Sequence, residues 1–196
     1  MREALDRLPR TMTVAQFLDW PGDGSGRRFQ LVNGELRAMS PASRAHGAIQ
    51  AALGRLIGNA LDIAGSRYDI VGGPGVVPGT LSQVNMRIPD LGITGTADAA
   101  GQRALPDPIV LIEILSPSNA SDTWDNVWAY TTIRTLREIV VVHSTRVLAE
   151  VLRAASTGIG PRRPRRLGAM ARCVSTASAS PARWQPSTPG RILRSL

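Results

Sequence analysis

The chain has 196 residues, an apolar share of 43% and a net charge of +8 at pH 7. This length favours one domain with one sizeable core, and a single cysteine, Cys173, excludes an internal disulfide and a cysteine-ligated zinc cluster. No segment approaches the ~18 consecutive apolar residues of a membrane span, and the N-terminus has no apolar signal sequence, so we expect a cytoplasmic protein.

A short helix and a β-hairpin are predicted first along the chain. Val14, Phe17 and Leu18 recur at helical spacing behind Thr13, which can serve as N-cap. The segments 28–32 and 35–39 then flank Asn-Gly at 33–34, whose tolerance of positive φ suits a two-residue type I′ turn. This pattern is the clearest hairpin signal in the sequence.

A long amphipathic helix is predicted over residues 41–64. Apolar residues recur along one helical face, with Ser40 available as N-cap and Gly65 just beyond the end. His46 and Gln50 lie four residues apart on this helix. We expect them on its polar surface, the alternative being that they face a functional site.

Strands are predicted over residues 67–71, 84–88, 91–94 and 109–115, followed by a helix over 122–134 and strands over 138–142 and 147–152. The run at 109–115 is nearly all apolar, which is typical of a central strand buried on both faces. We therefore predict an α/β fold for residues 1–152, with a central mixed β-sheet flanked by the two long helices.

After Leu152 the periodic pattern ends. Residues 151–196 contain 9 arginines and no acid, whereas residues 1–150 contain 14 basic and 15 acidic residues. Such Ala-, Ser-, Pro- and Arg-rich sequence cannot build a core, so we expect residues 153–196 to form a disordered basic tail. The abrupt loss of acids also leaves open that the tail results from a shifted reading frame.

Three acids stand where a strand meets a turn or lies in apolar surroundings: Glu35, Asp90 and Glu113. A carboxylate inside an apolar strand is costly to desolvate unless it is paired or binds a cation, and Asp90 on a neighbouring strand is the expected companion of Glu113. Two carboxylates with water suit Mg²⁺ or Mn²⁺, which can activate water for phosphodiester hydrolysis. The alternatives are structural: an ordinary turn acid at 90, a hairpin acid at 35, and a Glu113 paired with arginine 87 or 137.

Five segments together support a family resemblance. They read Phe-Gln-Leu-Val-Asn-Gly-Glu-Leu (29–36), Met-Ser-Pro-Ala-Ser (39–43) with His46, Ile-Pro-Asp-Leu (88–91), Ile-Glu-Ile-Leu-Ser-Pro-Ser (112–118) and Ala-Tyr (129–130). Over about residues 11–152 the chain resembles the Uma family of restriction-type endonucleases, which is similar to the PD-(D/E)XK nuclease superfamily. The resemblance implies a restriction-endonuclease-like core and a metal-dependent DNA endonuclease.

By this resemblance Asp90 and Glu113 are metal ligands, and Glu35 joins them as a third catalytic acid. The implied cofactor is Mg²⁺ or Mn²⁺ and the implied partner is DNA, with a homodimer as one arrangement and no membrane.

The chain departs from the superfamily at its lysine, which falls at Asn126. All 23 basic residues are arginine, and an amide cannot carry the positive charge. The loss of one such electrostatic group costs ~10²- to 10³-fold in rate, and Arg134 or Arg137 are the substitutes nearest in sequence. Two alternatives to an active nuclease are therefore open, namely a catalytically dead nucleic-acid-binding relative and a frame-shifted remnant.

Overall fold

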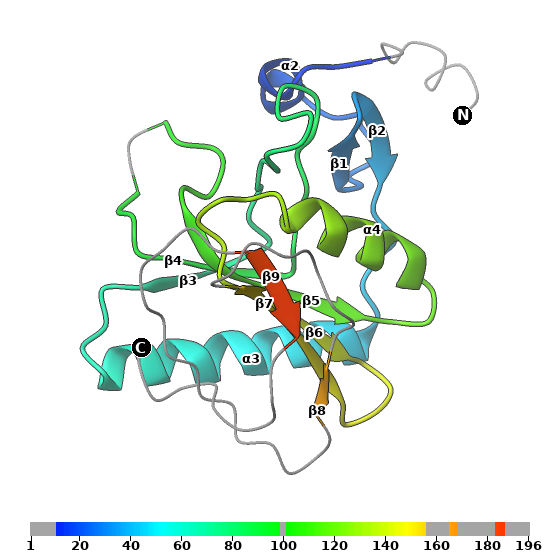
Figure 1. Cartoon of the computed structure of the whole chain (residues 1–196). Helices are drawn as coiled ribbons and strands as arrows, with labels where there is room; N and C mark the ends of the chain where they lie inside the picture. Colours follow the sequence, from blue (N-terminus) through cyan, green and yellow to red (C-terminus); the bar gives the residue numbers. More distant parts are fainter. Residues whose placement is uncertain (1–10, 99–100, 156–164, 168–182, 187–196) are drawn as a thin grey trace.

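A computed structural model describes residues 11–98, 101–155, 165–167 and 183–186. In these ranges a central sheet has the strand order β3-β4-β5-β6-β7-β8, β9 also pairs with β7, and β1 and β2 form a separate two-stranded sheet (Figure 1). β5 and β6 run parallel and the other neighbours run antiparallel. The predicted mixed α/β fold is therefore confirmed.

The helices and strands follow one another along the chain in a mixed order. They are α2 (Val14–Asp19), β1 (Phe29–Val32), β2 (Glu35–Ala38), α3 (Arg44–Ile63), β3 (Asp69–Gly72), β4 (Leu91–Thr94), β5 (Pro108–Leu115), α4 (Ala120–Tyr130), β6 (Glu138–His143), β7 (Ala149–Ala155), β8 (Arg165–Leu167) and β9 (Arg183–Pro186).

The N-terminal elements form for the local reasons that the sequence indicates. Thr13 caps α2 in a capping box with Gln16. Asn33 and Gly34 have φ values of 52° and 85°, and Val32 pairs with Glu35 across the turn, as a two-residue type I′ hairpin requires. The predicted helix and hairpin are confirmed.

The long helix α3 begins three residues later than predicted. Its N-cap is Ser43, whose hydroxyl accepts a hydrogen bond from the backbone N–H of His46, and not Ser40. At the other end Gly65 takes a φ of 59°, and the N–H of Ser66 bonds the carbonyl of Leu61 at 2.9 Å. This Schellman ending confirms Gly65 as the terminator.

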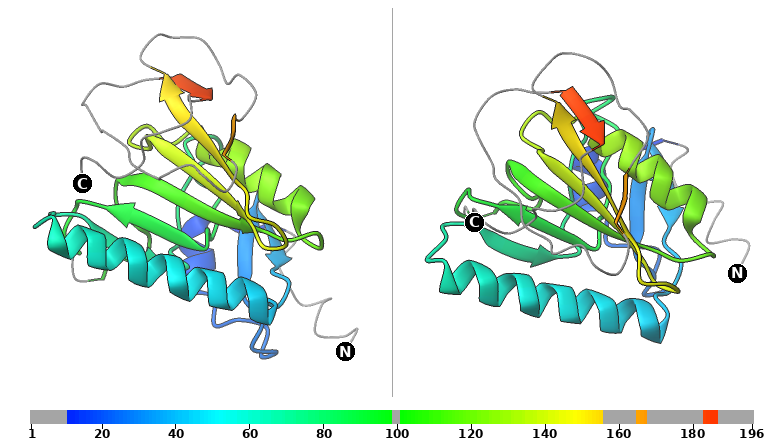
Figure 2. Two further views of the ribbon diagram at one scale, coloured as in Figure 1. Left: turned by 90° about the horizontal axis from the view of Figure 1, so that it is seen from below. Right: turned by 60° about the horizontal axis from the view of Figure 1, so that its bottom comes forward.

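The two long helices cover opposite faces of the central sheet (Figure 2). On one face α4 packs Val127 and Tyr130 against Leu111 of β5. On the other face α3 packs Leu53 against Ile112 of the same strand. Successive residues of β5 thus point to opposite helices, which fixes the face on which each polar residue of this strand must lie.

One prediction about the strands needs correction, and another is confirmed. Residues 84–88 form no named strand, because only the isolated bridges Leu31↔Met86 and Val76↔Arg87 occur there, one to each side. This segment therefore links the hairpin to the loop before it without joining the sheet. The apolar run at 109–115 is confirmed as the central strand β5.

The expected tail begins inside a strand, since β7 continues to Ala155. Two three- to four-residue strands, β8 and β9, also lie in the range 153–196 and pair with β7. The other residues of that range lie outside the described residues, so disorder of the tail and its origin in a shifted frame stay predictions. None of the described helices is long and apolar enough to cross a membrane.

Candidate functional site

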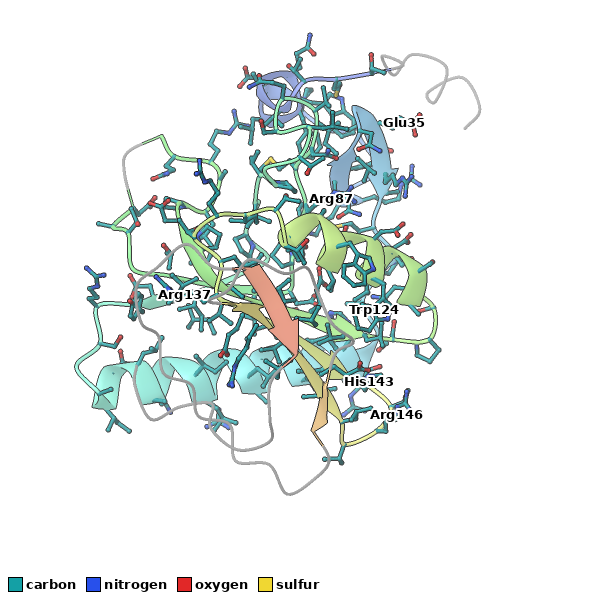
Figure 3. All side chains as sticks on the ribbon, in the orientation of Figure 1. Glu35, Arg87, Trp124, Arg137, His143 and Arg146 are labelled. Atoms are coloured by element: carbon teal, nitrogen blue, oxygen red, sulfur yellow. The ribbon has the colours of Figure 1, made fainter. Side chains whose placement is uncertain are left out.

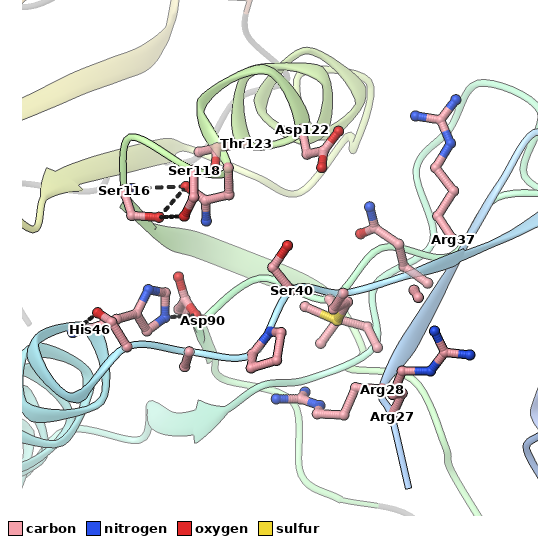
Figure 4. Close-up of a pocket in the computed structure, with 18 of the residues that line it drawn as sticks. Arg27, Arg28, Arg37, Ser40, His46, Asp90, Ser116, Ser118, Asp122 and Thr123 are labelled. Atoms are coloured by element: carbon pink, nitrogen blue, oxygen red, sulfur yellow. Dashed lines mark hydrogen bonds and ion pairs between the residues drawn. The ribbon is translucent and has the colours of Figure 1, made fainter. Parts of the chain in front are cut away.

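A pocket of about 610 Å³ opens between the hairpin, the start of α3, the adjoining ends of β4 and β5, and α4. Figure 4 shows arginines on the hairpin side and the acids and hydroxyls of the sheet and α4 opposite. The lining residues that bear on chemistry are Arg27, Arg28, Gln30, Arg37, His46, Gln50, Asp90, Glu113, Asp122 and Asn126.

Strand pairing brings Asp90 and Glu113 to one pocket. Leu91 of β4 lies opposite Ile112 of β5 in an antiparallel register, so the residue before Leu91 comes opposite the residue after Ile112. The two carboxylates therefore share one side of the sheet, and both line the pocket. The backbone N–H of Ile114 donates to Asp90 Oδ2 at 2.7 Å, which ties the two chain segments together.

Asp90 is held by α3 as well as by β5. His46 Nε2 lies 2.7 Å from Asp90 Oδ1, and Gln50 Nε2 donates to the Asp90 backbone carbonyl at 2.8 Å. The prediction that His46 and Gln50 lie on the polar surface is wrong. The cap at Ser43 starts α3 at the pocket edge, so its first two turns face the ends of β4 and β5.

Glu113 is buried, with 5% of its surface exposed. Tyr130 donates its hydroxyl proton to Glu113 Oε1 at 2.7 Å, and the amide of Asn126 donates to the same oxygen at 3.5 Å. Burial and then the charge of Asp90 raise the pKa of Glu113 to about 8, against the lowering effect of these hydrogen bonds. Among the described residues no hydrogen bond reaches Oε2, so this oxygen is left for a further partner.

The structural alternative for Glu113, an ion pair with Arg87, does not occur in the described part of the chain. Arg87 Nη1 instead donates to Asn126 Oδ1 at 3.0 Å, so the guanidinium reaches Glu113 only through the amide. Arg134 and Arg137, the substitutes suggested by sequence proximity, do not line the pocket.

Glu35 is not brought together with the other two acids. It is exposed on β2, directly after the hairpin turn, and does not line the pocket (Figure 3). The polar residue that the hairpin does contribute is Gln30 on β1. Its side chain is 6% exposed, and its buried Oε1 has no hydrogen-bond partner in the described residues. Sequence reasoning missed Gln30, although a glutamine among apolar residues in a fully buried strand is the signal that could have found it.

These residues fit a hard divalent cation. No group of three or more His, Cys, Asp or Glu side chains in the described ranges is arranged to hold a metal alone. Of the three carboxylates that line the pocket, Asp122 is exposed on α4, whereas Asp90 and Glu113 lie at the adjoining strand ends. The amide oxygen of Gln30, without a hydrogen-bond partner in the described residues, lines the same pocket. Oxygen ligands of this kind, completed by water and substrate, are what Mg²⁺ prefers.

The hairpin side of the pocket is basic. Arg27 pairs with Asp23 at 2.7 Å, and Arg28 donates to the Gly73 carbonyl at 3.3 Å, while Arg37 is exposed on β2. Three arginines thus line the hairpin side of a cavity whose other side holds Asp90 (Figure 4), and Glu113 lines the same cavity. Such a division of charge suits a substrate that carries an anion and reaches a metal.

Comparison with known proteins adds a family and a fold. A family model described as Uma2, putative restriction endonuclease, matches residues 14–170. A solved structure of a putative nuclease belonging to DUF820 from Anabaena variabilis ATCC 29413 is similar with a TM-score of 0.66 and 16% sequence identity, over 85% of this chain and 89% of that chain. A comparison with curated proteins finds no match.

Proposed function

Since the chain belongs to the Uma2 family of putative restriction endonucleases, we propose that it is a divalent-metal-dependent endonuclease that hydrolyses phosphodiester bonds in DNA. The observation that carries the proposal is the shared pocket of Asp90 and Glu113, where a buried carboxylate without a cation lies beside a second acid. A buried acid whose pKa is raised by burial and by a neighbouring carboxylate in a cavity is a sign of a functional site, and a metal ion removes the repulsion.

Asp90 and Glu113 would hold Mg²⁺ or Mn²⁺, and Gln30 Oε1 could add a neutral oxygen. Bound there, the ion would supply an activated water and would offset negative charge that develops on the phosphate. The chain's own residues contribute orientation. His46 fixes one oxygen of Asp90, and Tyr130 fixes Oε1 of Glu113, which turns Oε2 toward the cavity.

Nucleic acid suits the remaining wall of the pocket. Arg27, Arg28 and Arg37 line the hairpin side, and guanidinium groups bind phosphate oxygens through paired N–H donors. A strand whose backbone rests on these arginines would carry the adjacent phosphodiester to the two acids. DNA is the proposed substrate within the nucleic acids, and a homodimer stays a prediction.

The second candidate function is DNA binding without cleavage. The observation that favours it is Asn126, a buried neutral amide that lines the pocket where the family resemblance implies a lysine. In this case the arginine wall, formed by Arg27, Arg28 and Arg37, retains affinity for the phosphate backbone while the chemical step is lost.

The test uses supercoiled plasmid with the full chain in Mg²⁺ or Mn²⁺. We expect nicking that EDTA stops, that Asp90→Ala abolishes and that Glu35→Gln leaves unchanged, because Glu35 lies outside the pocket. A salt-sensitive shift of DNA mobility without nicking would establish the second candidate instead. Equal nicking by wild type and Asp90→Ala would refute the metal site.

A further inference from the structure

The guanidinium of Arg87 is a buried charge in the described part of the chain that no acid contacts directly, although Asp125 attracts it at longer range. Only 5% of this residue is exposed, and no acid lies within ion-pair distance of it among the described residues. Its hydrogen bonds go to two amides, with Nη1 3.0 Å from Asn126 Oδ1 and Nη2 3.4 Å from Asn85 Oδ1, while Nε has no partner in the ranges that the structure describes. A buried cation without a carboxylate is costly to keep, so its retention calls for a role.

The hairpin side of the molecule fixes where this guanidinium lies. Asn85 accepts a hydrogen bond from the Asn33 N–H at 2.7 Å and donates to the Thr80 carbonyl at 3.2 Å. The backbone of Arg87 is bridged to Val76 by two hydrogen bonds of 2.8 Å. Figure 3 shows Arg87 between the hairpin and α4. These hydrogen bonds thus fix the position of the Arg87 guanidinium, which is not a freely moving side chain.

The fixed position of the Arg87 guanidinium determines which way the Asn126 amide faces. An amide has one accepting oxygen and one donating NH₂ group, and a guanidinium can only donate. The oxygen must therefore face Arg87, which leaves the NH₂ group to face Glu113 Oε1 at 3.5 Å. Reversal of the amide would set NH₂ against the guanidinium and oxygen against the carboxylate, so both neighbours oppose it.

We propose that Arg87, which does not itself line the pocket, is its positioning cation through Asn126, and that these two residues together do what a lysine at 126 would do alone. The inference rests on the proposed nuclease function. The positive charge sits one amide away from the carboxylate, and the polarised NH₂ group of Asn126 presents the donor end to Glu113 and to the cavity that Asn126 lines.

This arrangement has a consequence for restoring the lysine. In Asn126→Lys the new ammonium group would be buried directly beside the positively charged Arg87 guanidinium. Like charges at such a distance disfavour each other. We therefore expect no gain of cleavage from Asn126→Lys alone, and a gain only when Arg87 is neutralised in the same chain.

The experiment compares wild type with Arg87→Met, Arg87→Lys, Asn126→Lys and the double variant Arg87→Met/Asn126→Lys. Plasmid nicking is measured at saturating Mn²⁺, Mn²⁺ affinity by calorimetric titration, and folding by thermal unfolding. We expect Arg87→Met to lower the nicking rate ~10²-fold without weakening Mn²⁺ binding, because a nearby cation repels the metal rather than holding it. Arg87→Lys should keep most of the rate, and the double variant should exceed both single variants.

A merely structural Arg87 would give a different pattern. Arg87→Met would then lose Mn²⁺ binding and thermal stability together with the rate, and the double variant would be no better, which overturns the inference. A rate unchanged in Arg87→Met, or raised by Asn126→Lys with Arg87 intact, also overturns it. A wild type that neither binds Mn²⁺ nor nicks DNA overturns the proposed function and the inference with it.

Wild type that binds Mn²⁺ but nicks nothing would overturn the proposed cleavage alone. The NMR signals of the Asn126 side-chain NH₂ group, assigned by their loss in Asn126→Asp, then decide the inference. We expect them to shift in Arg87→Met and to return toward the wild-type position in Arg87→Lys. Signals that do not respond to Arg87→Met would contradict the proposed positioning.

Discussion

Two groups of buried charged residues lie on the same central sheet and are built differently. At β6 and β7, Arg153 Nε lies 2.6 Å from Glu138 Oε1, and His143 Nε2 lies 2.8 Å from Glu150 Oε1. Both of these acids have a basic partner in direct contact. At the pocket, Glu113 is equally buried but has no cation within ion-pair distance in the described ranges.

Behind the pocket the imbalance is reversed: the buried Arg87 donates to the lining residue Asn126 and has no acid in direct contact in the part of the chain described. Buried polar groups are normally satisfied, so a matched pair is explained by the stability of the fold. A buried acid and a buried base that are held apart by the Asn126 amide are not explained in that way. The difference teaches that, in this chain, function is marked by the charges left unpaired rather than by the number of charges.

The largest difference between the two groups is expected when Glu113, the acid without a basic partner in the described residues, is neutralised. Glu113→Gln should lower metal-dependent nicking by ~10³-fold, because it removes a charged ligand of the cation. Glu150→Gln, in the paired group, is the matched control and should nick normally at a temperature where it is folded. Rates that fall equally in the two variants would erase the functional distinction between the groups.

The free energy of unfolding should respond in the opposite order to nicking, with the larger loss in a variant of the paired acid Glu150 and not in a variant of Glu113. Glu150→Ala leaves His143 buried without its acceptor and should lower the free energy of unfolding by about 2 kcal/mol. Glu113→Gln removes a poorly compensated carboxylate and should leave the free energy of unfolding unchanged or higher near pH 8. Urea unfolding measures both. A larger loss of stability in Glu113→Gln than in Glu150→Ala would show that Glu113 belongs to the structural class.

The unpaired acid should also give the fold a pH dependence. The pKa of Glu113 is raised from 4.5 to about 8, so between these values the folded chain holds a proton that the unfolded chain releases. The contribution of Glu113 to stability is therefore greatest below pH 4.5 and declines as the pH rises toward 8. Because each pKa unit corresponds to about 1.4 kcal/mol, we expect a fall of on the order of 4 kcal/mol between about pH 5 and about pH 8.5 in metal-free buffer.

The Glu113→Gln variant is the reference for this measurement, since the glutamine does not titrate. Its urea unfolding should show a flatter profile across the same pH range. Identical profiles in wild type and Glu113→Gln would mean that Glu113 is already ionised at low pH, and thus that its burial is compensated.

The smallest effect should come from the arginine wall. Arg37→Ala should weaken DNA binding by a few-fold and reduce the slope of log affinity against log salt by about one, as expected for the loss of one phosphate contact. Arg55 lies exposed on α3 and does not line the pocket, so Arg55→Ala is the control. Equal slopes for Arg37→Ala and wild type would remove Arg37 from the DNA path.

The sequence predicts much of this fold because its signals are local. The Asn33-Gly34 turn, the Thr13 cap, the Gly65 terminator and the apolar run of β5 each specify an element through neighbouring residues. Residues 84–88 were predicted as a strand and form only bridges, because their apolar pattern cannot show which partners lie on either side.

The site was predictable only where two strands pair. Asp90 and Glu113 could be inferred as companions because neighbouring strands bring their ends together. His46 and Gln30 reach the pocket from the helix and the hairpin, and Arg87 lies behind it on a bridging segment, in contact with the lining residue Asn126. These positions are a property of tertiary packing that spacing along the chain does not encode. Glu35 was expected in the site from the family resemblance, yet it is exposed on β2 and does not line the pocket.

The most direct measurement is a calorimetric titration of the full chain with Mn²⁺ in the absence of DNA, compared with Asp90→Ala, Glu113→Gln and Glu35→Gln. If Asp90 and Glu113 jointly hold the cation, wild type and Glu35→Gln should bind a single ion with equal affinity, and each pocket variant should lose that binding. Binding that persists in both pocket variants, or is absent from the wild type, would contradict the account.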